Sequence, residues 1–104
     1  MQVNFQAVHF TADQKLKDYI SEKLEKLVKF HPKVLITTIY MKLENSGQVK
    51  DKVLEAKISI PGHTLIATSK DKTFEAAFDD AIDNIKRQLK RQNDKEIAVD
   101  KSSR

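Results

Sequence analysis

The spacing of apolar residues changes several times along this chain, and this succession limits the folds open to it. Val3, Phe5 and Ala7 alternate with polar residues, which predicts a half-buried strand. Apolar residues then recur at helical spacing over 16–28 and again over 74–89. The segment between them is rich in β-branched and aromatic residues, which favours strands. The pattern therefore predicts an α+β protein.

Three consecutive strands are expected between the two helices, over 34–43, 52–60 and 64–69, with turn signals at 45–47 and at Pro61-Gly62. Strands joined by short turns form an antiparallel meander. The first strand is joined to the second through a helix, so these two should pair in parallel. Each helix has one apolar stripe and the outer strand faces are polar, which predicts a β-α-β-β-β-α sandwich. Its four-stranded sheet carries both helices on one face, as in double-stranded-RNA-binding domains.

The ends of the helices carry recognisable signals. Thr11 and Gln14 have the spacing of a capping box for the first helix, and Asp71 is placed to cap the last one. Pro32 should end the first helix, because the residue before a proline is disfavoured in the α conformation.

Length and composition indicate one domain. The 104 residues, 39% of them hydrophobic, match a domain of about 100–150 residues with a single core. We assign 1–92 to that domain and 93–104, where the periodicity is lost, to a flexible tail. No apolar run approaches the length of a membrane span, and the first residues do not resemble a secretory signal. With no cysteine in the chain, these features fit a cytoplasmic protein.

Histidines give no sign of a catalytic or metal site. His9, His31 and His63 are scattered over a strand end, a helix end and a turn, without the spacing of metal ligands. Two glycines cannot build a phosphate-cradling loop, and no nucleotide-binding or protease motif is present. We therefore expect no metal, no cofactor and no small-molecule substrate.

Three carboxylates in the last helix have a simple structural interpretation. Asp79, Asp80 and Asp83 lie in its first half, where acidic residues complement the helix dipole. Asp83 is also four residues before Arg87, a spacing that permits an ion pair. Acid–base catalysis by these residues is the weaker hypothesis, and the chain is not expected to be an enzyme.

Cations gather at the end of the last helix. The net charge of the chain is only +4, and the stretch 86–95 has five cations and one acid. These cations lie outside the apolar stripe, and they are Lys86, Arg87, Lys90, Arg91 and Lys95. A second set, Lys23, Lys26 and Lys29, steps along the first helix, which should lie beside the last one. Together they predict a phosphate-binding surface.

Aromatic residues do not interleave with these cations in the sequence. Phe74 and Phe78 belong to the core stripe, and Tyr40 lies in a strand. The stacking platform of single-strand binders is therefore not expected. Recognition of RNA by shape and phosphates fits the pattern better than base readout.

Two segments resemble the ribosome hibernation-promoting factors, also called ribosome-associated inhibitors or ribosomal subunit interface proteins. In the last helix the similarity lies in Ala76-Ala77, in Arg87-Gln88-Leu89 and in the basic residues that follow. In the first helix the run from Lys23 to Lys29, KLEKLVK, is similar to the pattern of the family. The opening strand, MQVNF, is also similar. The resemblance extends over about residues 1–95, and we expect the short, one-domain form.

The resemblance implies a binding function. Proteins of this family bind the small (30S) ribosomal subunit in the channel for mRNA and tRNA, and hold the ribosome inactive under stress or in stationary phase. The eight cations given above would then contact 16S rRNA, those of the last helix as the main set. The protein would be a monomer when free, with no membrane partner. Whether it promotes ribosome dimers or only inactive single ribosomes is left open.

Two other functions were weighed. A small enzyme of the acylphosphatase kind would need an arginine in a phosphate loop near the N-terminus, whereas the first arginine of this chain is Arg87. A modulator of a transcription factor would need a surface for a specific protein partner, and no motif in the sequence supports one.

Overall fold

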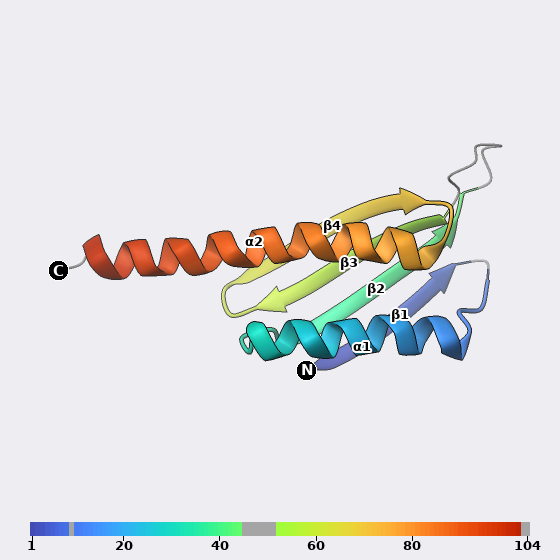
Figure 1. Ribbon diagram of the computed structural model, residues 1–104, viewed down its shortest axis with the longest axis horizontal. Coiled ribbons are helices and arrows are strands. Elements are labelled where there is room, and N and C mark those ends of the chain that lie inside the picture. Colours follow the sequence, from blue (N-terminus) through green and yellow to red (C-terminus); the bar gives the residue numbers. More distant parts are fainter. Residues whose placement is uncertain (9, 45–51, 103–104) are drawn as a thin grey trace.

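The structure is a computed structural model that describes residues 1–8, 10–44 and 52–102, with side chains up to residue 92. Its elements follow the predicted β-α-β-β-β-α order (Figure 1), and they are β1 (Gln2–Val8), α1 (Gln14–Phe30), β2 (Ile36–Leu43), β3 (Lys52–Ile60), β4 (His63–Asp71) and α2 (Phe74–Ser102). The expected turn at 45–47 lies outside the described residues.

The four strands form one mixed sheet in the order β1-β2-β3-β4. β1 pairs with β2 in parallel, and β2, β3 and β4 form the predicted antiparallel meander. At the turn between β3 and β4, Gly62 has a φ of 80°, a left-handed conformation that suits glycine. β2 begins at Ile36 rather than at residue 34.

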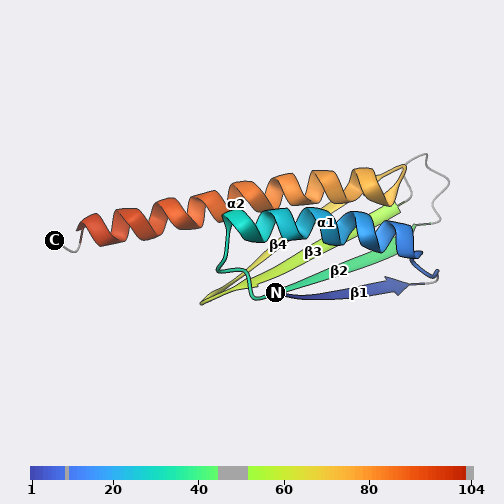
Figure 2. The same ribbon diagram turned by 60° about the horizontal axis from the view of Figure 1, so that its bottom comes forward.

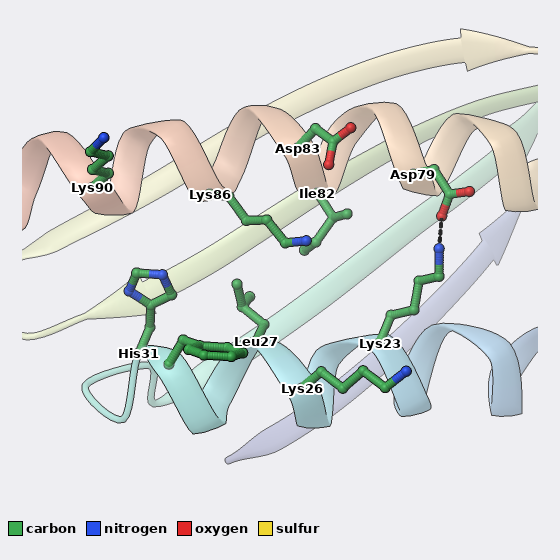
Figure 3. Close-up of a pocket in the computed structure, with 10 residues that line it drawn as sticks. Lys23, Lys26, Leu27, His31, Asp79, Ile82, Asp83, Lys86 and Lys90 are labelled. Atoms are coloured by element: carbon green, nitrogen blue, oxygen red, sulfur yellow. Dashed lines mark hydrogen bonds and ion pairs between the residues drawn. The ribbon is translucent and has the colours of Figure 1, made fainter.

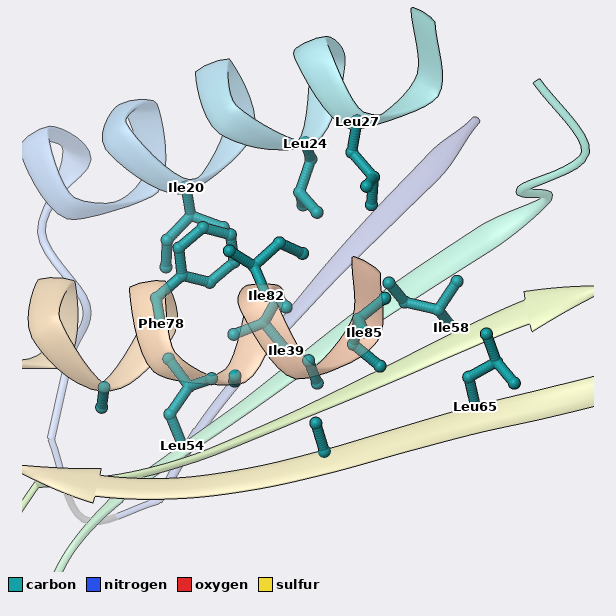
Figure 4. Close-up of a cluster of buried hydrophobic side chains, with 14 of the residues drawn as sticks. Ile20, Leu24, Leu27, Ile39, Leu54, Ile58, Leu65, Phe78, Ile82 and Ile85 are labelled. Atoms are coloured by element: carbon teal, nitrogen blue, oxygen red, sulfur yellow. The ribbon is translucent and has the colours of Figure 1, made fainter. Parts of the chain in front are cut away.

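Both helices cover the same face of the sheet, and Figure 2 shows them as one layer above it. On β3, Leu54, Ala56 and Ile58 are fully buried beneath the helices. The apolar stripes of α1 and α2 supply the other half of the core, including Ile20, Leu24, Phe78 and Ile85 (Figure 4). The predicted two-layer α+β sandwich is therefore confirmed.

The one buried polar side chain recorded in the described part of the chain is Thr37, on the core face of β2. Its hydroxyl donates a hydrogen bond to the sulfur of Met1 at 3.2 Å. At the other edge of the sheet, the Gln88 amide of α2 donates to the carbonyl oxygen of Ile66 in β4 at 3.0 Å. This bond satisfies a backbone acceptor on an edge strand, a position where open backbone groups favour pairing with other chains.

Both predicted N-caps are wrong, and in each case a nearer residue caps the helix. The Asp13 carboxylate accepts a hydrogen bond from the Leu16 N–H at 2.8 Å, so Asp13 and not Thr11 starts α1. The Thr73 hydroxyl accepts from the Ala76 N–H at 3.1 Å. Asp71 cannot take this role because it is still paired within β4. The end of α1 before Pro32 is as predicted.

α2 is longer than the sequence pattern indicates. It continues to Ser102, past the end of the sheet (Figure 1), although its last buried residue is Leu89. The prediction that the helix ends near Asn93 is therefore wrong. Residues 93–102 contain no glycine or proline, and backbone hydrogen bonding needs no apolar stripe. In the described part of the chain, neither helix is long and apolar enough to span a membrane.

The packing of Phe78 between the helices and the sheet predicts a large effect of its removal. Phe78→Ala should lower the free energy of unfolding by about 3–5 kcal/mol, because a fully buried aromatic ring leaves a cavity. Phe30→Ala is the matched control, since Phe30 is 80% exposed and its loss should cost about 0.5 kcal/mol or less. Urea unfolding followed by circular dichroism measures both. Equal losses would contradict the described core.

Candidate functional site

A groove runs between α1 and α2 on the outer side of the helix layer. It has a volume of about 840 Å³, and its floor is apolar, formed by Leu27 and Ile82. The two helices run in the same direction (Figures 1 and 2), so that the second half of α1 lies beside the middle of α2. The groove therefore collects side chains from both helices, as the sequence predicted for the two cationic sets.

Four of the predicted cations line this groove, Lys23 and Lys26 from α1 and Lys86 and Lys90 from α2 (Figure 3). Lys29, Arg87 and Arg91 are exposed but are not among the lining residues. Lys95 lies within α2, beyond the described side chains. The structure thus brings half of the predicted set into one groove and leaves three members on the adjoining helix surfaces.

One end of the groove is held by a polar cluster that joins the helices. The Lys23 ammonium lies 2.6 Å from an Asp79 carboxylate oxygen. The Tyr19 hydroxyl donates to both oxygens of the same carboxylate, at 3.0 and 2.9 Å, and the ammonium lies 4.8 Å from the centre of the Tyr19 ring. Hydrogen bonds to Asp79 and then to Tyr19 raise the pKa of Lys23 above its ordinary value. Lys23 is therefore a charged, structurally engaged residue.

The carboxylates of α2 do more than complement the helix dipole. Asp79 connects α2 to α1, a role that spacing within one helix could not reveal. Asp83 lines the groove, and the ion pairs recorded within the described side chains do not include the Asp83–Arg87 pair that the sequence permits. The groove is consequently divided into a partly neutralised end at Asp79 and Asp83 and a cationic end at Lys86 and Lys90.

The cationic end also contains two residues that the sequence analysis did not select. His31 caps the C-terminus of α1, and its ring points towards α2 (Figure 3). Phe30, the last residue of α1, lines the same groove and is 80% exposed. The expectation that no aromatic residue accompanies the cations is therefore wrong. Phe30 is three residues from Leu27 in sequence, but it lies past the edge of the sheet-facing stripe.

Metal binding finds no site among the described residues. No three histidine or acidic side chains within them gather closely enough to hold an ion. The chemistry that the groove offers is attraction of anions, with ammonium groups above an apolar floor.

Arrangement and charge together define a small α+β module with a cationic surface made by two parallel helices. Residues 3–97 match the family of the Sigma 54 modulation protein and S30EA ribosomal protein. The chain belongs to this family, which confirms the resemblance seen in its helices.

Curated relatives match over nearly the whole chain. A ribosome hibernation promoting factor of Pseudomonas putida is 34% identical over 99 residues, which cover 95% of this chain and 93% of the relative. A protein of the same name from Azotobacter vinelandii is 28% identical over 97 residues, covering 93% and 87% of the two chains.

Solved structures share the fold. A ribosomal subunit interface protein from Coxiella burnetii superposes with a TM-score of 0.80 at 16% identity, covering 89% of this chain and 98% of its own. The N-terminal domain of Protein Y from Thermus thermophilus gives a TM-score of 0.74 at 24% identity, covering 88% and 98%.

The polar cluster at Asp79 should make a small contribution to stability. Asp79→Asn removes the charge that holds Lys23 and should lower the free energy of unfolding by about 1 kcal/mol or less. The side chains of Lys23 and Asp79 are 39% and 41% exposed, so water screens the pair. Asp80→Asn, the same change at an exposed neighbouring position, should have almost no effect in urea unfolding. A larger loss for Asp80→Asn would contradict this cluster.

His31 should make stability depend on pH. Burial, and then the nearby charge of Lys86, lower the pKa of His31 below its ordinary value of 6.5. The unfolded chain therefore binds a proton more readily than the folded one, and the free energy of unfolding falls as the pH drops below about 6.5.

The measurement is urea unfolding at pH 5.5 and pH 7.5. His31→Gln should reduce the difference in stability between the two pH values, because the titrating group is gone. His63→Gln, which changes an exposed histidine at the start of β4, should leave that difference as in the parent protein. An unchanged difference in His31→Gln would show that this histidine does not carry the effect.

Proposed function

We propose that this protein is a ribosome hibernation factor that binds the small ribosomal subunit through 16S rRNA, in the channel for mRNA and tRNA. Occupying that channel blocks translation sterically, and the ribosome stays inactive under stress or in stationary phase. No bond is made or broken in this mechanism, so the protein acts without catalysis, in the cytoplasm. Membership of the family and the names of the relatives support this assignment.

The observation that carries the proposal is the convergence of cations from two helices. Lys86 and Lys90 lie one turn apart in the groove, facing the helix that bears Lys26. Arg87 and Arg91 form a second row on the exposed surface of α2, rotated by about 100° from the first. A folded RNA strand can therefore meet positive charge in the groove and on the outer side of α2.

The remaining members of the set have graded roles in this proposal. Lys95 would extend the contact along α2, and Lys26 and Lys29 would add phosphate contacts from α1. Lys23 would contribute least, because its ammonium is already paired with Asp79. Fixed phosphate contacts with bridging cations, and not base-pair readout, are the means by which folded RNA is recognised by shape.

Reversal of the four described cations of α2 should abolish ribosome binding. In the variant Lys86→Glu, Arg87→Glu, Lys90→Glu and Arg91→Glu, each side chain is exposed, so the fold should persist by circular dichroism. Co-sedimentation with purified small subunits at several salt concentrations measures the loss. Neutralising the four residues by glutamine instead should flatten the plot of log affinity against log salt by about 3, at roughly 0.7–0.9 per phosphate contact.

A matched control has the same change of net charge at other exposed positions. Lys15, Lys42, Lys57 and Lys72 are exposed and lie outside the groove. Their reversal to glutamate should weaken binding only through the overall charge, far less than reversal on α2. Equal losses in the two variants would refute the assignment of the surface, and a parent protein that does not sediment with ribosomes would refute the function.

A further inference from the structure

Phe30 is the residue of the groove that phosphate binding leaves unexplained. Its ring is 80% exposed, more than any other large hydrophobic side chain of the described residues. A single exposed apolar residue is ordinary on a protein surface. Phe30 differs from such residues because it lines the groove that contains the cations of both helices.

Three ammonium groups surround this aromatic ring within the groove. Lys26 precedes Phe30 by one turn of α1, so the two side chains lie on the same side of that helix. Lys86 and Lys90 face them from α2, and Lys86 extends across the groove towards α1 (Figure 3). Phosphate binding would use only the ammonium groups. An exposed flat ring between them matches a ligand that has both phosphates and a planar apolar group.

We propose that Phe30 is a stacking site for an unpaired base of RNA, while Lys26, Lys86 and Lys90 hold the phosphates on either side of it. This inference rests on the proposed function and specifies which RNA the groove accepts: an unstacked nucleotide in a single-stranded or looped segment. Aromatic side chains beside a positive groove bind bases in this way without strong preference for sequence. The outer row of α2 would still contact RNA by its phosphates alone.

The partly neutralised end of the groove fits this assignment. Asp79 and Asp83 repel phosphates, so a bound strand would be directed to the end that contains Phe30 and Lys90. An acidic peptide would be attracted by the same ammonium groups, but its carboxylates make no use of an exposed ring. The combination of ring and cations therefore favours a nucleotide.

Binding of the full chain to purified bacterial small subunits tests the inference. Phe30→Ala should weaken binding by about 5- to 100-fold, the range for loss of one stacked base, with an unchanged salt dependence. Phe30→Trp should restore it. Ile66→Ala, which truncates a 50% exposed residue on the opposite face of the sheet, should bind as the parent does.

The results separate the two levels of the proposal. If the parent and Phe30→Ala bind equally, the stacking site is refuted and the proposed function stands. If the parent itself does not bind, the proposed function fails. A flatter salt dependence in Phe30→Ala would also overturn stacking, because it would mean that a phosphate contact had been lost.

Fluorescence gives a direct readout, since the chain contains no tryptophan. In Phe30→Trp, a short single-stranded RNA of mixed sequence should quench the emission, and a duplex of the same length should quench it much less. Ile66→Trp provides the control fluorophore and should respond to neither. Equal quenching by duplex and single strand, or quenching by polyglutamate and not by RNA, would overturn the inference.

Discussion

Burial of apolar side chains between the two helices and the sheet fixes the position of every charged group in the groove. Phe78 and Ile85 of α2 and Ile20 and Leu24 of α1 are fully buried against one another and the strands. Each such side chain contributes about 1.5–3 kcal/mol on burial. The exposed ion pair of Lys23 and Asp79 contributes at most about 1 kcal/mol. The apolar contacts therefore hold the helices together, and the polar cluster selects their alignment.

The same packing explains how a chain with little net charge has a strongly cationic surface. The two apolar stripes face the sheet, so the charged residues of α1 and α2 are forced outward and towards each other across the groove. Asp79 offsets Lys23 at one end, whereas no acidic residue lines the groove beside Lys90. The charge of the groove thus changes along its length, and a polyanion is favoured at one end only.

Much of the fold follows from periodicity alone. The order of elements, the buried faces of β3 and α2, the parallel pairing of β1 and the meander were all predictable, because each depends on spacing within a segment or on the length of a connection. The caps were not, since Thr11 and Asp13 are equally good acceptors and only the first helical turn distinguishes them. The extension of α2 was missed because helical hydrogen bonding leaves no apolar pattern where there is no core.

The candidate site was predictable as a set of cations but not as a groove. Lysines on two separate helices can be expected to converge once both helices are placed on one face. Asp79 is 56 residues from Lys23 in sequence, so their pairing appears only in three dimensions. Phe30 is similar: sequence shows an aromatic residue at a helix end, and only the packed structure shows that the sheet does not cover it.

α2 behaves mechanically as a rod fixed along half of its length. Its buried residues end at Leu89, and the helix runs on to Ser102, about 20 Å farther at 1.5 Å per residue. A tilt of 10° at the fixed half would move the free end by roughly 3 Å, about the length of a hydrogen bond. The geometry at the tip is thus set by the tightness of the core around Ile85 and Leu89. A small change of volume in the interior would misalign contacts made far outside it.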